Sequence, residues 1–155
     1  MENAELREQI DRYYQLWCDV TQLYEKWAKR RGRTYNTVLT LCTLLSNQEH
    51  CTQKMICEQW GFPKQTVNTI LKDFKKKGYV TFAYLESDKR NKLISLTDSG
   101  SEYANEISSA LYALDFYAIE KMGLTRMTTL NNNLALYLKY YREGEQGDDD
   151  TRSQI

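Results

Sequence analysis

The sequence contains very little proline, histidine or glycine, and it lacks any long apolar run. Among its 155 residues there are one proline, one histidine and seven glycines. Because proline and glycine interrupt helices, their scarcity favours long helices. No segment approaches the roughly 18 consecutive apolar residues of a transmembrane helix. Residues 1–12 are polar and acidic, unlike a signal peptide, so we expect a cytoplasmic protein with no membrane partner.

Signatures of an enzyme or a metal site are also missing. We find no glycine-rich phosphate loop, no G-x-S-x-G and no paired acids in an apolar setting. The spacing of His50 from the cysteines matches no usual zinc pattern. Free thiols are the expected state of the four cysteines in a reducing compartment: Cys18, Cys42, Cys51 and Cys57. We therefore predict no catalytic residue, no cofactor and no metal.

Positive charge is concentrated in two segments of a chain whose formal net charge is zero. Residues 64–92 contain eight Lys or Arg and three Asp or Glu, a net charge of +5. Residues 26–33 contain five cations and no acid. Basic segments also serve solubility alone, but this local asymmetry is the electrostatic pattern of a protein that binds a polyanion.

A long N-terminal helix is predicted over residues 4–31, ending in a basic run before Gly32. Its apolar stripe is broader and more aromatic than one helix needs to rest on a small domain, so it indicates a partner surface. A monomeric helical core is the alternative. The stripe consists of Leu6, Ile10, Tyr13, Trp17, Val20, Tyr24 and Trp27.

Three shorter helices and a hairpin are expected next. Thr34 and Thr52 suit the N-caps of helices over 35–45 and 53–60, and a third helix is expected from Pro63 to about residue 77. In the second of these helices the residues expected to face inward are Met55, Ile56 and Trp60. Two short apolar strands are then expected at 79–85 and 92–96, on either side of a charged turn at 86–91.

The C-terminal third is predicted to be helical. Thr97 begins one helix, a second follows Gly123, and the segment from Glu143 to Ile155 is acidic and lacks apolar periodicity. The order of helix, short helix, glycine turn, helix and hairpin is that of a winged helix-turn-helix. The predicted fold class is therefore mainly α with a small β-hairpin wing, carried between long N- and C-terminal helices.

The helix over 64–76 has two contrasting faces. Val67, Ile70, Leu71 and Phe74 follow helical spacing and predict a buried side. The opposite side carries amides and hydroxyls near its start, which can pair with base edges, and lysines near its end, which can meet phosphates. An ordinary solvated face is the alternative. The candidate DNA-binding residues here are Lys64, Gln65, Thr66, Asn68, Thr69, Lys72 and Lys76.

The segment after this helix resembles the wing of the multiple-antibiotic-resistance regulator (MarR) family of bacterial winged-helix transcription factors. Asp88-Lys89-Arg90, followed by Leu93-Ile94-Ser95-Leu96-Thr97-Asp98-Ser99-Gly100, is similar to the family's Asp-x-Arg tip and Leu-Thr-x-x-Gly ending. The resemblance implies that Arg90 enters the minor groove, with Asp88 holding it, and a guanidinium suits a narrow, negative minor groove. A solvent-exposed turn pair is the alternative for these two residues. Lys89 and Lys92 complete the candidate DNA contacts.

Some positions depart from the family pattern. Pro63 replaces the Ser or Thr that commonly opens the family's recognition helix, and Phe82 replaces a frequent arginine at the start of the wing. Thr69 and Asp73 stand where basic residues are common. These departures bear on operator sequence and affinity and leave the predicted fold unchanged.

The resemblance also implies a domain organisation and a function. Residues 1–33 and 101–143 would form the dimerisation region, 34–100 the DNA-binding lobe and 144–155 a flexible acidic tail. The implied protein is a homodimeric regulator, more often a repressor, that binds double-stranded DNA at a pseudo-palindromic operator. The rival interpretation is a winged-helix adaptor whose basic face docks on an acidic protein.

Two routes of regulation follow from the same resemblance. A pocket for a small aromatic or anionic effector is expected near the junction of the dimerisation helices and the lobe, although core packing also explains the aromatics. Its candidate residues are Tyr13, Trp17, Tyr24, Trp27, Arg30 and Tyr35. Cysteine oxidation is the second route, with Cys51 beside His50 as the candidate sensor because a sensor thiol needs exposure and a low pKa. The other three cysteines are expected to fill helix faces, and four unreactive thiols remain the alternative.

Overall fold

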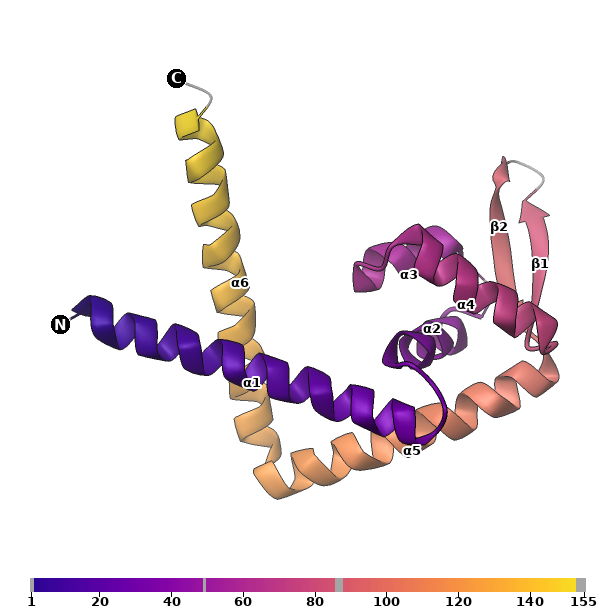
Figure 1. The fold of residues 1–155 in the computed structure, drawn as a ribbon, viewed down its shortest axis with the longest axis horizontal. Coiled ribbons are helices and arrows are strands. Elements are labelled where there is room, and N and C mark those ends of the chain that lie inside the picture. Colours follow the sequence, from indigo (N-terminus) through magenta and orange to yellow (C-terminus); the bar gives the residue numbers. More distant parts are fainter. Residues whose placement is uncertain (1, 49, 86–87, 153–155) are drawn as a thin grey trace. The chain divides into compact units, whose positions relative to one another are not determined.

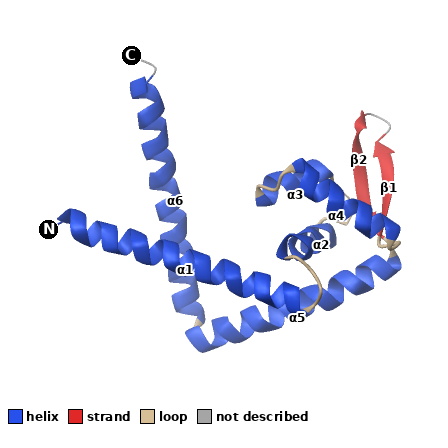
Figure 2. Cartoon of the chain, viewed as in Figure 1, coloured by secondary structure: helices blue, strands red, loops and turns tan. Residues whose placement is uncertain are grey.

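The structure, a computed structural model, describes residues 2–48, 50–85 and 88–152, with the backbone alone described at 2, 85, 88–91 and 147–152. Helices and one antiparallel hairpin make up these ranges (Figures 1 and 2). The elements are α1 (Glu2–Arg30), α2 (Tyr35–Ser46), α3 (Gln53–Trp60), α4 (Lys64–Lys76), β1 (Val80–Leu85), β2 (Asp88–Leu96), α5 (Asp98–Met122) and α6 (Leu124–Arg152). This order confirms the predicted winged helix-turn-helix.

The chain divides into two compact units, 1–109 and 110–155, and α5 continues from the first into the second. The first unit holds α1 to β2 together with the start of α5. The second holds the rest of α5 and α6. The predicted division into dimerisation and DNA-binding regions is a functional one and stays a prediction.

The predicted helix boundaries in the lobe are set by local hydrogen bonds. The hydroxyl of Thr34 accepts from the Thr37 N–H and that of Thr52 from the Met55 N–H, both at 3.2 Å. Each satisfies an N–H that the first turn of a helix leaves without an intrahelical acceptor. Gly61 ends α3 in the left-handed region at φ +66°, where glycine carries no steric cost.

The second strand of the hairpin is longer than predicted. The expected charged turn at 86–91 is wrong from Asp88 onward, because β2 begins there. Tyr84 pairs with Lys92 and Leu85 with Asp88, with a register shift between the two pairs. Strands pair through their backbone N–H and C=O groups, so the charged side chains at 88–92 did not mark where pairing ends.

The core of the lobe is built from α2, α3, α4 and the hairpin. Its fully buried apolar side chains include Val38, Leu41, Leu44, Ile56, Val67, Phe74 and Ile94. The prediction that Met55 and Trp60 also point inward is wrong, since they are 36% and 38% exposed. Trp60, the last residue of α3, donates its indole N–H to the hydroxyl of the buried Thr43 at 2.8 Å, so one edge of its ring contacts the lobe while the rest lies in solvent.

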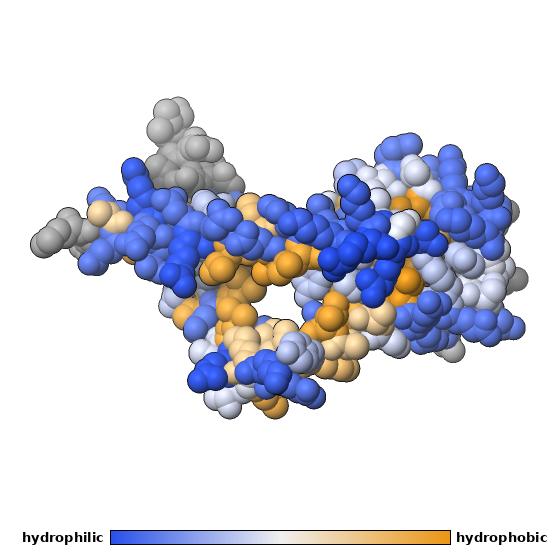
Figure 3. Space-filling view, turned by 60° about the horizontal axis from the view of Figure 1, so that its bottom comes forward, coloured by the Kyte–Doolittle hydropathy of each residue, from blue (hydrophilic) through white to orange (hydrophobic). Residues whose placement is uncertain are grey.

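α1 carries a row of exposed apolar side chains. Leu6, Ile10, Leu16, Trp17, Val20 and Leu23 are between 45% and 66% exposed, and Figure 3 shows hydrophobic residues along this helix. Only near its C-terminal end does α1 bury side chains, at Trp27 and Ala28. In the described part of the chain no helix is long and apolar enough to span a bilayer.

The second unit contains the break predicted at Gly123, which adopts φ +92° between α5 and α6. α6 continues to Arg152, beyond the expected loss of periodicity near Glu143. Residues 143–152 include two glycines and three aspartates, which are poor helix formers, so intrinsic propensity does not account for the longer helix. The flexibility of 144–155 stays a prediction. Exposed apolar side chains are numerous in this unit and include Leu114, Phe116, Tyr117, Leu130, Tyr137 and Tyr141.

Candidate nucleic-acid interface

α4 is anchored through one face, as its spacing predicts. Val67, Ile70, Leu71 and Phe74 are each no more than 9% exposed. Burying four apolar side chains of this size contributes about 1.5–3 kcal/mol each relative to leaving them exposed. The helix is therefore fixed in rotation about its axis, and its remaining faces are presented in a defined direction.

The predicted outward residues of α4 lie where the pattern placed them. Lys64, Gln65, Thr69, Lys72 and Lys76 are exposed, and Thr66 and Asn68 are half-buried on the flanks. The start of the helix is held by the Gln53 side chain, whose amide donates to the Lys64 carbonyl at 3.0 Å. The Thr69 hydroxyl donates to the Gln65 carbonyl at 3.0 Å, which leaves its oxygen able to accept.

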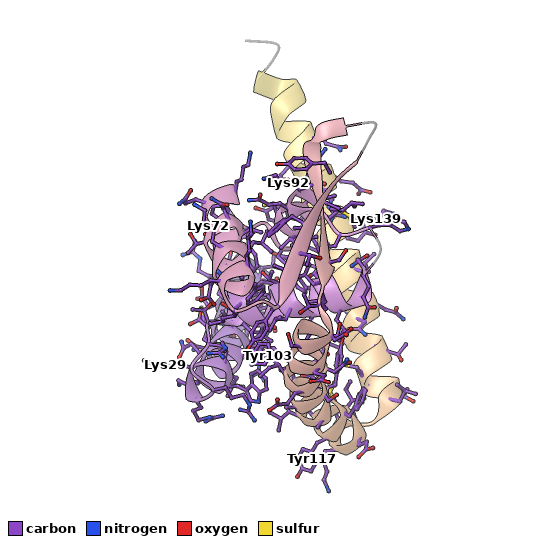
Figure 4. All side chains as sticks on the ribbon, turned by 90° about the vertical axis from the view of Figure 1, so that its right-hand side faces the viewer. Lys29, Lys72, Lys92, Tyr103, Tyr117 and Lys139 are labelled. Atoms are coloured by element: carbon purple, nitrogen blue, oxygen red, sulfur yellow. The ribbon has the colours of Figure 1, made fainter. Side chains whose placement is uncertain are left out.

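A groove of about 360 Å³ separates α4 from the hairpin. Two lysines in it lie over aromatic rings. The Lys75 ammonium is 5.6 Å from the Phe82 ring centroid, and the Lys92 ammonium is 5.2 Å from that of Tyr84. Figure 4 shows Lys72 on α4 and Lys92 on the hairpin. The groove is lined by Gln53, Asn68, Leu71, Lys72, Lys75, Phe82, Tyr84 and Lys92.

The other flank of α4 faces the N-terminus of α2 and has a different character. Its groove is lined by Thr34, Asn36, Thr37, Gln65, Thr66, Thr69, Ile70 and Asp73. Hydroxyls and amides dominate here, and the described lining contains one acid and no cation. Asp73 forms an ion pair with Lys77 along the helix. The two flanks of α4 therefore differ in charge, with the lysines on the hairpin side.

The tip of the hairpin carries three of the predicted contact residues, Asp88, Lys89 and Arg90. Their backbone belongs to β2, but their side chains lie outside the described part of the chain. The roles of Arg90 and Asp88 remain predictions. Lys92, four residues after Asp88, is described and exposed.

The Leu-Thr-x-x-Gly segment has a structural role where α5 starts. The Thr97 hydroxyl donates to the Gly78 carbonyl at 2.6 Å and accepts from the Gly100 N–H at 3.1 Å, while the Thr97 N–H donates to the Tyr79 carbonyl at 2.9 Å. A Cβ on Gly100 would collide with the Tyr79 carbonyl oxygen. Threonine and glycine are therefore required because α5 starts directly against the exit of α4.

Beside this junction lies a cluster that the sequence did not reveal. The Tyr79 and Tyr103 rings stack with centroids 4.8 Å apart, and Tyr79 also contacts Phe74 of α4 at 6.3 Å. The Arg33 Nε donates to the Tyr103 hydroxyl, and this hydrogen bond raises the pKa of Arg33. Residues 33 and 103 are 70 positions apart, so no local periodicity joins them.

The predicted effector residues are only partly brought together. Tyr24 and Tyr35 stack at 4.9 Å, whereas Trp17 is 59% exposed and contacts Tyr13 on the same helix at 6.3 Å. Trp27 is 3% exposed, and its indole N–H has no hydrogen-bond partner in the described part of the chain. Arg30 is exposed. Arg31, the residue after Arg30, lies over the Trp27 ring instead, with its guanidinium carbon 4.2 Å from the ring centroid.

The thiols do not follow the expected pattern. Cys51 is fully buried, and burial raises the pKa of its thiol from 9.0 to about 11. Both observations oppose its predicted role as a sensor, which needs exposure and a low pKa. Cys18, expected to fill a helix face, is exposed. Among the described residues, no cluster of three or more His, Cys, Asp or Glu could hold a metal ion.

Comparisons with known proteins place this geometry in a family. The family model described as MarR family matches residues 32–91, which run from before α2 into the hairpin. The transcriptional regulator SarZ of Staphylococcus aureus is 30% identical over 101 residues, covering 64% of this chain and 68% of that protein. SarZ of Staphylococcus epidermidis is 29% identical over 109 residues, covering 70% of this chain and 73% of that protein.

Solved structures are similar over most of the chain. NMB1585, a MarR family regulator from Neisseria meningitidis, is 28% identical with a TM-score of 0.74, covering 91% of this chain and 96% of that one. The structure of overoxidized AbfR bound to DNA is 28% identical with a TM-score of 0.56, covering 79% of this chain and 96% of that one. The MepR–DNA complex of Staphylococcus aureus, at 20% identity and a TM-score of 0.67 with 82% and 93% covered, shares the fold.

Proposed function

This chain belongs to the MarR family of DNA-binding transcriptional regulators, and on that premise we propose that it represses transcription as a homodimer on a pseudo-palindromic operator. The observation that carries the proposal is the rotation of α4. Its buried face turns Gln65, Thr69 and Lys72 outward together. Side-chain amides can read base edges in the major groove, and ammonium groups meet the phosphates beside it.

A dimer is supported by the exposed apolar side chains of α1. A row that includes Leu6, Ile10 and Leu23 is exposed in the single chain, and contiguous exposed apolar surface of this kind marks an interaction site. A second copy is the simplest partner, since isologous pairing is the commonest assembly. Two α4 helices would then address sites about 34 Å apart, one turn of DNA.

The wing supplies the second DNA contact in this proposal. Arg90 would enter the minor groove next to the major groove that α4 occupies, with Asp88 orienting it and Lys89 meeting phosphate. Strand pairing that continues as far as Leu85 and Asp88 supports an ordered wing.

Control of binding would come from an effector that prefers a lobe spacing unsuited to DNA and so depletes the DNA-competent state. The buried Trp27 N–H without a described partner supports a ligand with a hydrogen-bond acceptor near α1 and α2. Stacked Tyr24 and Tyr35 would provide an aromatic wall. Release by oxidation at Cys51 is less favoured because that thiol is buried.

The test is fluorescence anisotropy with duplex DNA across a salt series, together with the solution mass of the protein. The regulator should be a dimer and lose affinity steeply as salt rises, because binding releases counterions from phosphates. The adaptor alternative predicts no DNA binding even at low salt. A monomer at working concentrations would contradict the proposed homodimer.

A further inference from the structure

The two flanks of the recognition helix α4 are not equivalent in charge. The groove on the hairpin side contains Lys72, Lys75 and Lys92, and no acid occurs among its described lining residues. The groove on the α2 side contains Asp73 and no cation among its described lining residues. Among the described lining residues the cations that could attract an anion beside α4 therefore lie on the hairpin side.

Two of these lysines are held over aromatic rings. Lys75 lies over Phe82 at 5.6 Å and Lys92 over Tyr84 at 5.2 Å, so one cation from α4 and one from β2 lie over alternate residues of β1 that line the groove toward α4. Attraction to the ring face contributes about 0.5–1 kcal/mol at an exposed site. This attraction biases the lysine side chain toward the ring without neutralising its charge, although it is smaller than the roughly 1.5–2 kcal/mol of rotamer entropy that a lysine loses when fully ordered.

DNA geometry determines what must pass this groove. If α4 occupies the major groove and the wing the adjacent minor groove, the sugar–phosphate strand that separates the two grooves crosses the surface between α4 and the hairpin. That surface is the one lined by the lysine–aromatic pairs. A phosphate there would meet two ammonium groups supplied from opposite walls.

We propose that Lys75 over Phe82 and Lys92 over Tyr84 form a seat for the DNA backbone between the recognition helix and the wing. This inference rests on the proposed function and extends it to Lys75, Phe82 and Tyr84. The rings set where the ammonium groups lie, and the ammonium groups bind phosphate independently of base sequence. The seat uses only described residues and does not depend on the tip of the wing.

The experiment uses the full chain and a fluorescein-labelled duplex of mixed sequence, roughly 30 base pairs long, which accommodates two half-sites. Binding is measured by anisotropy across a NaCl series for wild type and for the pair K75Q/K92Q. The matched control is K121Q/K139Q, because Lys121 and Lys139 also lie over rings, at 5.5 and 5.6 Å from Tyr117 and Tyr140. Thermal melting checks that each variant folds as the wild type does.

Loss of the seat should flatten the salt dependence. Removing two phosphate contacts per chain should lower the slope of log K against log salt by about 2 to 4 for a dimer, while the control keeps the wild-type slope. F82L and Y84L, which keep apolar volume and remove the ring, should each weaken binding about two- to five-fold.

Equal slopes for K75Q/K92Q and wild type would overturn the proposed seat without contradicting the proposed function as a DNA-binding regulator. Unchanged binding by both ring variants would overturn the role of the rings, and a wild type that binds no DNA would overturn seat and function together.

Discussion

Tyr103, in the second turn of α5, stacks on Tyr79 at the exit of α4, with ring centroids 4.8 Å apart and planes 17° apart. Tyr79 in turn contacts Phe74 on the buried face of α4, and Arg33 from the α1–α2 connection donates to the Tyr103 hydroxyl. One cluster therefore joins the α1–α2 connection, the exit of α4 and the start of α5. The cluster therefore packs the start of α5 against the exit of α4.

Replacing Tyr103 should loosen that joint. Tyr103→Ala removes the stack and the Arg33 contact, and we expect a loss of about 2 kcal/mol of unfolding free energy, in the usual range for removing packed groups. Tyr103→Phe keeps the ring and loses only the hydrogen bond, so it should cost less than half as much. Urea denaturation of both variants checks this. Equal stability of the alanine variant and the wild type would contradict the packing described.

Gly100 should not tolerate a side chain. Its Cβ would strike the Tyr79 carbonyl oxygen, a backbone atom that cannot rotate away, so Gly100→Ala should destabilise by about 1–3 kcal/mol or more. Gly144→Ala is the control, because that helical glycine has nothing within 4 Å of a built Cβ. The control should be neutral or gain up to about 1 kcal/mol. Similar melting of the two variants would argue against the close approach of α5 to Tyr79.

Arg90→Ala should weaken DNA binding broadly and leave the solution mass of the dimer unchanged. The guanidinium is proposed to enter the minor groove, where it contributes through shape and charge more than through one base. Anisotropy on several unrelated duplexes, with sedimentation of the free protein, tests both parts. Wild-type affinity in this variant would remove the wing from the proposed interface.

Gln65 and Asn68 should govern sequence preference. Both lie in the first half of α4, exposed and half-buried respectively, and their amides can pair with adenine edges. Gln65→Ala and Asn68→Ala are expected to change the ranking of operator variants by about 1–3 kcal/mol at the contacted base pair. A uniform loss across all variants would show that these residues only position the helix.

Cys51 should make stability fall as the solution becomes alkaline. Its thiol pKa is raised from 9.0 to about 11 by burial, so between these values the unfolded chain loses a proton that the folded chain keeps. Unfolding is therefore increasingly favoured as pH rises. Between pH 8 and pH 10 the wild type should lose about 1 kcal/mol more than Cys51→Ala. Parallel stability profiles for the two proteins would contradict the burial of this thiol.

The sequence predicted what is local and periodic. Thr34 and Thr52 identified helix starts because capping needs one hydroxyl at one position, and the apolar spacing around Val67 identified the buried face of α4. The partial exposure of Trp60 was not predicted, because its contact with Thr43 lies 17 positions away and no local periodicity indicates it. The second strand of the wing was predicted too short because strand pairing depends on the partner strand and on the register shift after Tyr84.

The interface was predicted residue by residue but not as a surface. Helical spacing separates the inward face of α4 from its outward face, yet it does not tell which flank faces the hairpin and which faces α2. The difference in charge between those flanks depends on tertiary contacts such as that of Lys75 with Phe82, which the sequence does not indicate. The Arg33–Tyr103 contact could not be predicted for the same reason, because no local sequence pattern links two residues 70 positions apart.

Selection of protein-bound duplexes from a random-sequence pool, followed by sequencing, tests the central claim most directly. A homodimer that inserts α4 into successive major grooves predicts an enriched inverted repeat whose half-site centres lie about 10 base pairs apart. The same selection with the protein carrying K64Q, K72Q and K76Q should recover little DNA. Recovery of no enriched sequence from the wild type at low salt, or of a lone asymmetric half-site, would contradict the account.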